Sequence, residues 1–404
     1  MAASPRKSAV NVRRPEIMGE VEKDIRERYF SPLVDHIRAS GNVLALDNMT
    51  VRLARHFGFC NGVRRAIETA HAARLAFPGR RIFLIGEIIH NPDVNRTLDE
   101  MGLHRLPWKE CAREFERLEP GDVVLIPAFG VSVPFRRFLE EKGVVLVDAT
   151  CGDVMRVWRQ VARFAQNGVT SVIHGKATHE ETVATASHAR GEDGQGHFII
   201  VYTREDVECL AGYILGTGSR EEFMNRFARA VSPGFDPDVH LKSVGMANQT
   251  TMLEEETRLF QQILRAAVMK RDGGPGNFRI CDTICSATQD RQSALTELLA
   301  QPLDALFVVG GYNSSNTAHL AEIARRVLPA ACFVSGADCV AGLRSVRSFD
   351  IRTREERETA LPPEASDLSR RWVVGVTAGA SCPASKIEGL IRRLAGLRRC
   401  SLPE

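Results

Sequence analysis

The stretch FGFCNGVRRAIETA, residues 57–70, joins two patterns that decide the fold class. An extended apolar run begins before this stretch and continues into its first residues. In this run Val51, Leu53, Phe57 and Phe59 alternate with other residues. Apolar residues then recur every three or four positions until Pro78-Gly79. Period-two alternation is typical of a strand and the wider spacing of a helix, so the stretch predicts a strand, a tight turn and a helix, with Cys60 at the junction.

The same strand–turn–helix unit recurs along the chain. GVVLVDATCGDVMRVWRQVARFAQNG (143–168) and FRICDTICSATQDRQSALTELLAQP (278–302) place Cys151 and Cys285 at their turns. LDALFVVGGYNSSNTAHLAEIARRV (303–327) and RWVVGVTAGASCPASKIEGLIRRLAGL (371–397) have turns rich in Gly, Ser and Asn instead. Strands that alternate with helices in this way predict layered α/β domains with parallel sheets.

Two stretches lack this pattern and indicate connections or insertions: the weakly patterned 191–240 and the charged 352–371. Domain edges are therefore expected near residues 150 and 280. The resulting division is an N-terminal extension (1–46), a first α/β domain (47–150), a second α/β domain with an insertion (151–280) and a third α/β domain (281–404).

The bulk composition excludes several classes of protein. The 53 Lys and Arg residues nearly balance the 50 Asp and Glu residues, so charge gives no case for a nucleic-acid binder. No apolar run approaches the roughly 18 residues of a membrane span. The opening MAASPRKSAVNVRR has no apolar core and predicts no secretory signal, although it is basic and free of acids like an organelle transit peptide. A cytoplasmic protein is expected in preference to a plastid one, and its ten cysteines are then thiols or ligands.

Three cysteines, Cys60, Cys151 and Cys285, each precede a predicted helix. The positive end of a helix favours thiolate, the form that binds metal. Three equivalent turns could converge on one iron–sulfur cluster and leave its fourth iron without a protein ligand, open to substrate. The ordinary role of any single cysteine is a small buried apolar residue, and the chain has no CxxC pair that would argue otherwise.

Nine blocks, in order, carry a resemblance over roughly residues 47–396: GFCNGVRRAI, EIIHNPDVNRTLDEMG, PAFGVS, VDATC, HGKATHEETVATASHA, ANQTTM, TICSATQDRQ, VVGGYNSSNTAHL and GVTAGAS. Together they resemble the 4-hydroxy-3-methylbut-2-enyl diphosphate reductases, the IspH/LytB family, in the longer branch of cyanobacteria and plants. The resemblance implies three α/β domains related by a pseudo-threefold axis around a central cavity that holds a 4Fe-4S cluster.

Carried over position by position, the resemblance implies three cluster ligands, Cys60, Cys151 and Cys285. It implies catalytic roles for Glu181, His179 and Thr250, with Glu181 as the acid. It implies substrate-binding roles for His90, His179, Ser314, Ser315, Asn316 and Ser381. The residues are suited to those roles, because a helix start rich in short hydroxyls binds phosphate, imidazole donates to phosphate oxygens and a carboxyl relays protons. Taken singly, the serines would be ordinary helix caps and the histidines surface or capping residues.

The reaction that the resemblance implies is reductive loss of the hydroxyl from (E)-4-hydroxy-3-methylbut-2-enyl diphosphate, which gives isopentenyl and dimethylallyl diphosphate. This is the last step of the non-mevalonate isoprenoid pathway. The chain has no GxGxxG after a strand, so the electrons are expected from reduced ferredoxin or flavodoxin and not from a bound nicotinamide.

Three positions depart from the common family pattern. Phe129 stands where many members have a phosphate-binding histidine, Gly152-Asp153 stands where a proline is common, and Cys382 follows Ser381 where a small residue without a thiol is usual. Two alternatives remain open at this point. One is a non-catalytic iron–sulfur redox sensor on the same scaffold, and the other is a zinc enzyme that uses the same thiols with His179.

Overall fold

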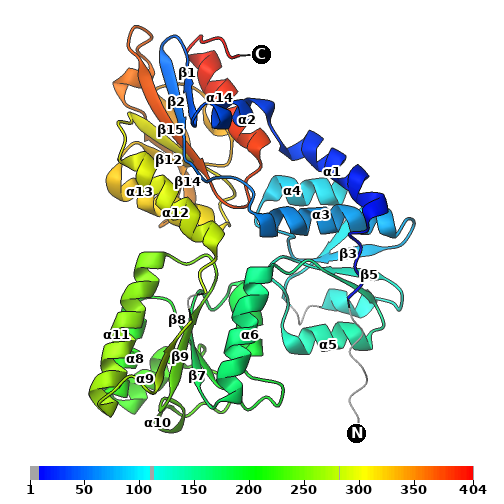
Figure 1. Cartoon of the computed structure of the whole chain (residues 1–404), viewed down its shortest axis with the longest axis vertical. Coiled ribbons are helices and arrows are strands. Elements are labelled where there is room, and N and C mark those ends of the chain that lie inside the picture. Colours follow the sequence, from blue (N-terminus) through cyan, green and yellow to red (C-terminus); the bar gives the residue numbers. More distant parts are fainter. Residues whose placement is uncertain (1–8, 110–112, 282, 404) are drawn as a thin grey trace. The chain divides into compact units, whose positions relative to one another are not determined.

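The computed structural model describes residues 9–109, 113–281 and 283–403. They form an α/β protein with parallel sheets, as the strand–turn–helix pattern predicts (Figure 1). The chain divides into two compact units. Unit 1 comprises 1–12, 77–88 and 102–285, and unit 2 comprises 13–76, 89–101 and 286–404.

Unit 1 contains eight strands and seven α-helices among its described residues. The strands are β3 (Ile82–Ile85), β4 (Leu103–Leu106), β5 (Val123–Ile126), β6 (Val145–Asp148), β7 (Thr170–His174), β8 (Phe198–Val201), β9 (Val244–Asn248) and β10 (Phe278–Ile280). The α-helices are α5 (Val133–Glu141), α6 (Gly152–Gln166), α7 (Glu180–His188), α8 (Arg204–Ile214), α9 (Arg220–Phe227), α10 (Pro237–His240) and α11 (Glu254–Asp272).

Unit 2 contains the remaining described elements. Its strands are β1 (Val43–Ala45), β2 (Met49–Leu53), β11 (Ala305–Val309), β12 (Ala331–Val334), β13 (Ser345–Asp350), β14 (Glu355–Ala360) and β15 (Trp372–Ala378). Its α-helices are α1 (Pro15–Tyr29), α2 (Pro32–Ala39), α3 (Asn61–Ala76), α4 (Pro92–Glu100), α12 (Ser286–Leu299), α13 (Ser315–Val327) and α14 (Ala384–Leu397).

Three sheets share one strand order. Two of them lie in unit 1, with the orders β4-β3-β5-β6 and β8-β7-β9-β10, and every neighbouring pair is parallel. In both, the first strand in sequence lies between the second and the third, and the fourth lies at the edge. The sheet of unit 2 has the parallel order β12-β11-β15-β2, with β1 added antiparallel to β2. The same layout therefore occurs three times.

The fourth parallel strand of the third sheet is β2, which comes from the N-terminal part of the chain, whereas β11, β12 and β15 come from the C-terminal part. β2 takes the place that β6 and β10 take in their own sheets, and it pairs with β15 from Trp372 opposite Met49 to Val376 opposite Leu53. Residues 49–53 thus belong to a sheet whose other parallel strands all come after residue 300. The sequence pattern shows a strand here but not its partners.

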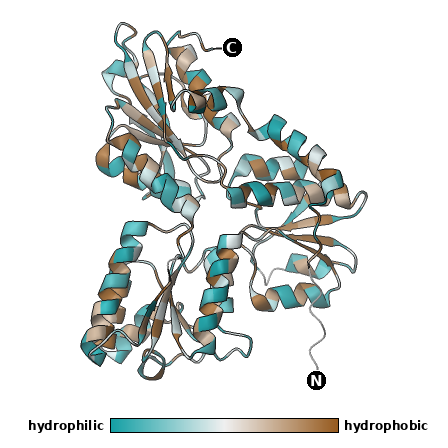
Figure 2. Cartoon of the chain, in the orientation of Figure 1, coloured by the Kyte–Doolittle hydropathy of each residue, from teal (hydrophilic) through white to brown (hydrophobic). Residues whose placement is uncertain are grey.

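Apolar residues explain why several strands lie in the interior. The strands β3, β5, β7, β9, β11 and β12 are buried along their whole length, as parallel strands covered on both faces are. In the β7–β10 sheet, Val172, Val244 and Met246 pack with α8 and α11, whereas Ile173 and Ala247 pack with α6 and α7. Figures 1 and 2 show the helices on either side of these strands and the apolar colour concentrated on the strands.

The stretch 191–240 is more regular than the sequence pattern indicates. In place of a connection it contains β8 and the helices α8, α9 and α10. The strand escapes notice because it has only four residues, FIIV, and such a short apolar run carries no period. The stretch 352–371 holds β14, which is mostly exposed and pairs with β13 in a hairpin between β12 and β15.

The strand expected through Phe59 ends earlier, at Leu53. The backbone leaves the sheet after Ala54 and turns at Gly58, whose φ of +76° is a conformation that glycine adopts readily. The domain edges expected near 46, 150 and 280 stay predictions. Within the described residues, no helix is both long enough and apolar enough to cross a membrane.

Candidate functional site

The candidate residues lie beyond the carboxyl ends of corresponding strands. In each sheet the second strand lies on one side of the first strand and the third strand lies on the other side, so the direction in which strands are added reverses at the first strand. In parallel sheets, ligands bind outside the carboxyl ends at such a switch point. His90, His179 and Ser314 follow the first strands β3, β7 and β11. Thr250 and Ser381 follow the third strands β9 and β15, and the three cysteines follow the fourth strands.

Each of the three cysteines is held by the same backbone hydrogen bond. The N–H of Cys60 donates to Ala380 O at 3.2 Å, that of Cys151 to Ala128 O at 3.0 Å, and that of Cys285 to Thr250 O at 3.2 Å. Each acceptor lies two residues beyond the last residue of its third strand, and each cysteine immediately precedes a helix or caps it. The three thiols therefore hold equivalent positions in three equivalent sheets.

The three cysteines are less buried than three others that lie in the cores. Cys60, Cys151 and Cys285 are partly exposed, whereas Cys332, Cys339 and Cys382 are buried. Burial raises the pKa of Cys332 and that of Cys382 to about 12, so both keep their protons at neutral pH. The Sγ of Cys60 accepts the N–H of Val63 at 3.4 Å, a bond that suits a sulfur bearing negative charge.

In unit 1, Glu181 and Thr250 form what we call the acid pair. Glu181 is only 2% exposed. Thr250 donates its backbone N–H to Oε1 at 2.6 Å and its Oγ1 hydroxyl to Oε2 at 3.0 Å. The carboxylate also lies in the first turn of α7, where the helix dipole favours negative charge. Both oxygens are thus oriented by one residue, whose carbonyl in turn accepts the N–H of Cys285.

The structure distinguishes the two neighbouring glutamates. The side chain of Glu180 is 19% exposed and its Oε2 lies 3.9 Å from Nδ1 of His179, too far for a hydrogen bond. Glu181 is the buried residue of the two and the one that Thr250 holds. Adjacent residues at a helix start point in different directions, so the letters EE alone do not say which one is inside.

His179 is the N-cap of α7, and its ring geometry fixes a tautomer. Its Nδ1 accepts the backbone N–H of Glu181 at 3.2 Å. The neutral ring therefore carries its proton on Nε2, which can donate to a ligand. Phe129, the residue that departs from the family pattern, packs edge-on against this ring with centroids 5.7 Å apart and planes at 86°. Phe129 thus supports His179 through packing.

In unit 2, what we call the serine cluster gathers at the start of α13. Its members are Ser314, Ser315, Asn316 and Ser381, which are 5%, 7%, 3% and 6% exposed. Ser314 caps the helix, and its Oγ lies 3.4 Å from Oγ of Ser381. Ser381 donates its hydroxyl to His90 O at 3.0 Å. Hydroxyls and N–H groups at a helix N-terminus make a site for phosphate.

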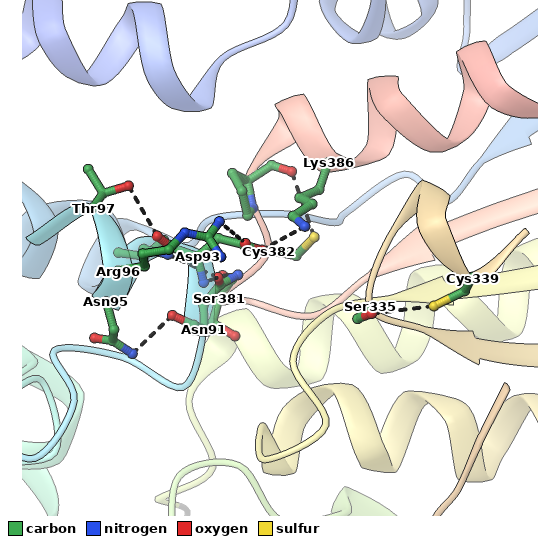
Figure 3. Close-up of polar contacts among 12 residues, drawn as sticks. Asn91, Asp93, Asn95, Arg96, Thr97, Ser335, Cys339, Ser381, Cys382 and Lys386 are labelled. Carbon is green, nitrogen blue, oxygen red and sulfur yellow. Dashed lines mark hydrogen bonds and ion pairs between the residues drawn. The ribbon is translucent and has the colours of Figure 1, made fainter. Parts of the chain in front are cut away.

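Asn316 and Asn91 tie the serine cluster to its surroundings. Asn316 accepts the N–H of Ala380 at 2.9 Å and donates to Thr288 at 3.3 Å. Asn91 donates its Nδ2 to Ser381 O at 2.7 Å while its Oδ1 caps α4 (Figure 3). Asn91 was missed by the sequence reasoning. The available signal was an asparagine immediately before Pro92, since Asn followed by Pro is typical of a helix start.

Removing the Thr250 hydroxyl is expected to destabilise unit 1. In Thr250→Val the buried carboxylate of Glu181 loses one donor and keeps the backbone one, which should lower the free energy of unfolding by about 1–3 kcal/mol. Thr250→Ser keeps the hydroxyl and should be close to the unsubstituted protein. Denaturant unfolding of the two variants measures the difference. Equal free energies of unfolding for Thr250→Val and Thr250→Ser would show that this hydrogen bond does not stabilise the fold.

Comparison with known proteins agrees with this geometry. The family model described as LytB protein matches residues 51–395. A 4-hydroxy-3-methylbut-2-enyl diphosphate reductase from a Synechococcus species is 42% identical over 379 residues, which cover 93% of this chain and 90% of that protein. The enzyme of the same name from Gloeobacter violaceus is 42% identical over 391 residues, which cover 95% and 91%. The expected likeness to the cyanobacterial branch is confirmed.

Two solved structures are also similar. The structure of (E)-4-hydroxy-3-methyl-but-2-enyl diphosphate reductase, described as the terminal enzyme of the non-mevalonate pathway, has a TM-score of 0.54 and 25% identity and covers 86% of this chain and 99% of that one. The Plasmodium falciparum E-1-hydroxy-2-methyl-but-2-enyl-4-diphosphate reductase, with a TM-score of 0.62 and 22% identity over 85% of this chain and 87% of that one, shows the same fold. The match over residues 51–395, together with relatives about 40% identical over nearly their whole length, shows that this chain belongs to the LytB protein family.

Proposed function

We propose that this chain reduces (E)-4-hydroxy-3-methylbut-2-enyl diphosphate to isopentenyl and dimethylallyl diphosphate, the last step of the non-mevalonate isoprenoid pathway. The observation that carries the proposal is the chain of contacts from Cys285 through Thr250 to the buried carboxyl of Glu181. These contacts join a candidate metal ligand to a candidate proton donor, and all three residues lie beyond the strand ends of the β7–β10 sheet. Family membership supports the same activity.

The serine cluster supplies the diphosphate end of the proposed site. Ser314, Ser315 and Asn316 offer hydroxyl, amide and helix N-terminal N–H donors, and Ser381 adds a hydroxyl from the neighbouring strand end. Such donors bind phosphate oxygens without requiring a lysine or arginine. His179, with its proton on Nε2, and His90 are the proposed imidazole donors to the same ligand.

The acid pair supplies protons at the other end. The net change is R–OH plus two electrons and two protons to R–H plus water, so a C–O bond breaks and a C–H bond forms. Breaking the C–O bond requires a proton for the departing hydroxyl, and Glu181 is the proposed source. Thr250 orients both carboxyl oxygens and can pass a proton through its hydroxyl.

Cys60, Cys151 and Cys285 are the proposed ligands of a 4Fe-4S cluster. The donor set fits such a group, because three partly exposed sulfurs occupy equivalent positions beside helix starts while the buried cysteines belong to the cores. When bound, the cluster supplies the two electrons one at a time and an iron position without a protein ligand. The three matching sheets also support the proposed arrangement of three domains around a common cavity.

The electron donor and the compartment are also proposals. A reduced ferredoxin or flavodoxin is the proposed donor, because the sequence has no nucleotide-binding GxGxxG after a strand. A cytoplasmic location is proposed from the use of the cysteines as thiols and ligands, which requires a reducing environment.

Anaerobic purification followed by two measurements tests the function. We expect broad visible absorption and turnover of the diphosphate alcohol with a chemical reductant. A coloured protein without turnover would indicate the redox sensor, and a colourless protein that contains zinc would indicate the zinc enzyme. Either result would overturn the proposal.

Exposure to air is expected to bleach the protein and abolish turnover, because an iron position without a protein ligand is open to oxidants. The visible absorbance and the activity should fall together over an aeration time course. Colour and activity that persist unchanged through prolonged aeration would contradict the open iron position.

A further inference from the structure

An ion pair lies close in sequence to Asn91 and Ser381, two residues after the first and five after the second. The Nζ of Lys386, in the first turn of α14, is 2.7 Å from Oδ2 of Asp93, in the first turn of α4 (Figure 3). Arg96 contacts the other carboxylate oxygen of Asp93 at 2.5 Å. Neither the sequence pattern nor the proposed reaction assigns these residues a role.

The pair acts on the same two segments that the serine cluster joins. Residues 90–93 lead into α4, and residues 381–386 lead into α14. Two hydrogen bonds join these segments beside the proposed diphosphate site. Asn91 donates its Nδ2 to Ser381 O at 2.7 Å, and Ser381 donates its hydroxyl to His90 O at 3.0 Å. Lys386 and Asp93 form a third connection, which completes a three-point link between the segments.

The electrostatics indicate that the link is formed at neutral pH. Burial acts to raise the pKa of Asp93, but the hydrogen bonds and charges of Lys386 and Arg96 outweigh it and hold that pKa below its ordinary value. The side chains of Lys386 and Asp93 are 31% and 30% exposed, so solvent screens the pair only in part. The Lys386 chain also packs beside Gly336, where a Cβ would lie 3.4 Å from its Cδ and Nζ.

We propose that Lys386 and Asp93 are a positioning pair that sets the separation of His90 from Ser381 and thereby the affinity for the diphosphate. The inference rests on the proposed function. The pair does not touch the ligand; it fixes the two backbone segments from which the ligand's donors project. Since binding requires those donors at hydrogen-bond distance simultaneously, loosening one segment weakens binding more than it slows the chemical step.

Lys386→Met and Asp93→Asn test the proposal. Each is expected to raise KM, and the Kd for inorganic diphosphate, by about fivefold, with kcat changed less than about twofold. The double variant should be no worse than either single one, because both remove the same link. Lys386→Arg keeps the charge and should restore most of the affinity.

Asp93→Asn separates positioning from simple charge. If Lys386 acted only as a positive charge near the ligand, removing the Asp93 carboxylate would tighten diphosphate binding. Positioning predicts the opposite sign. Tighter binding in Asp93→Asn, or an unchanged KM in Lys386→Met, overturns the proposal.

Arg392→Met is the matched control. Arg392 lies on the same helix, where its Nε contacts Glu388 at 2.6 Å in an i,i+4 pair, and its replacement should leave KM unchanged. Thermal unfolding of all variants shows whether each remains folded. Turnover by the unsubstituted chain is measured first, and its absence would contradict the proposed function. If the unsubstituted chain turns over and the Lys386 and Asp93 variants have the same KM as it does, only the positioning pair is contradicted.

Discussion

Glu181→Gln is expected to lower kcat by about 100- to 10,000-fold, the range that general acid catalysis contributes. The amide oxygen of glutamine can still accept a hydrogen bond from Thr250, and the side chain keeps its length, so the start of α7 should remain intact. What the variant lacks is a carboxyl group that can take up a proton and deliver it. Steady-state kinetics with a chemical reductant should therefore show a large fall in kcat and a small change in KM.

Glu180→Gln is the control for this substitution. Glu180 is the adjacent residue, it is more exposed than Glu181, and Thr250 does not hold it. Its replacement should change kcat less than about threefold, because no proton transfer is proposed for Glu180. If Glu181→Gln retains most of the activity, or if Glu180→Gln loses more, the proton donor has been assigned to the wrong glutamate.

Cys285→Ser is expected to reduce turnover to background and to remove most of the visible absorption. A serine hydroxyl is a harder ligand than a thiolate and does not ionise near neutral pH, so a cluster held by three thiolates would lose one of its supports. The backbone N–H to Thr250 O is unaffected by the side chain, and the fold of unit 1 should persist. Iron content and the visible spectrum of anaerobic protein measure the loss.

Cys209→Ser provides the comparison for a cysteine outside the proposed ligand set. Cys209 lies on α8 in the same unit, is partly exposed like Cys285, and packs against the apolar core of the β7–β10 sheet. Its replacement should leave iron content and turnover near those of the unsubstituted protein. Equal loss of colour in both variants would mean that the absorption does not report on Cys285.

Local pattern was sufficient for the elements that carry the cysteines. The strand and helix around Cys151 appear as β6 and α6, because α6 has a clear apolar stripe. Those around Cys285 appear as β10 and α12, where Ala294, Leu295 and Leu298 are the buried apolar residues of the helix. The pattern was insufficient for β8, which is four apolar residues without a period. Sequence periodicity predicts whether a segment is a strand or a helix, and only indirectly which other segments it pairs with.

The candidate site shows the same division. The blocks around Glu181 and Ser314 stand out in the sequence, but the choice of Glu181 over Glu180 depends on which carboxylate meets Thr250, 69 positions away. The role of Asn91 depends on a bond to Ser381, 290 positions away. Contacts of this kind join loops whose spacing in the chain varies freely, so they leave no local signal.

The pairing of β2 with β15, a strand from the other end of the chain, has a consequence for the order in which the protein is made. The β3–β6 and β7–β10 sheets are each continuous in sequence, so each can assemble soon after it leaves the ribosome. β2 emerges before both, but its parallel neighbour β15 is synthesised about 320 residues later. At roughly 5–20 residues per second, that strand and the loop bearing Cys60 wait more than about 15 seconds for their partner. The loop of Cys60, the first of the three proposed ligands to be synthesised, is therefore the last to be fixed. A nascent chain that stops short of β15 cannot form the backbone hydrogen bond from Cys60 to Ala380.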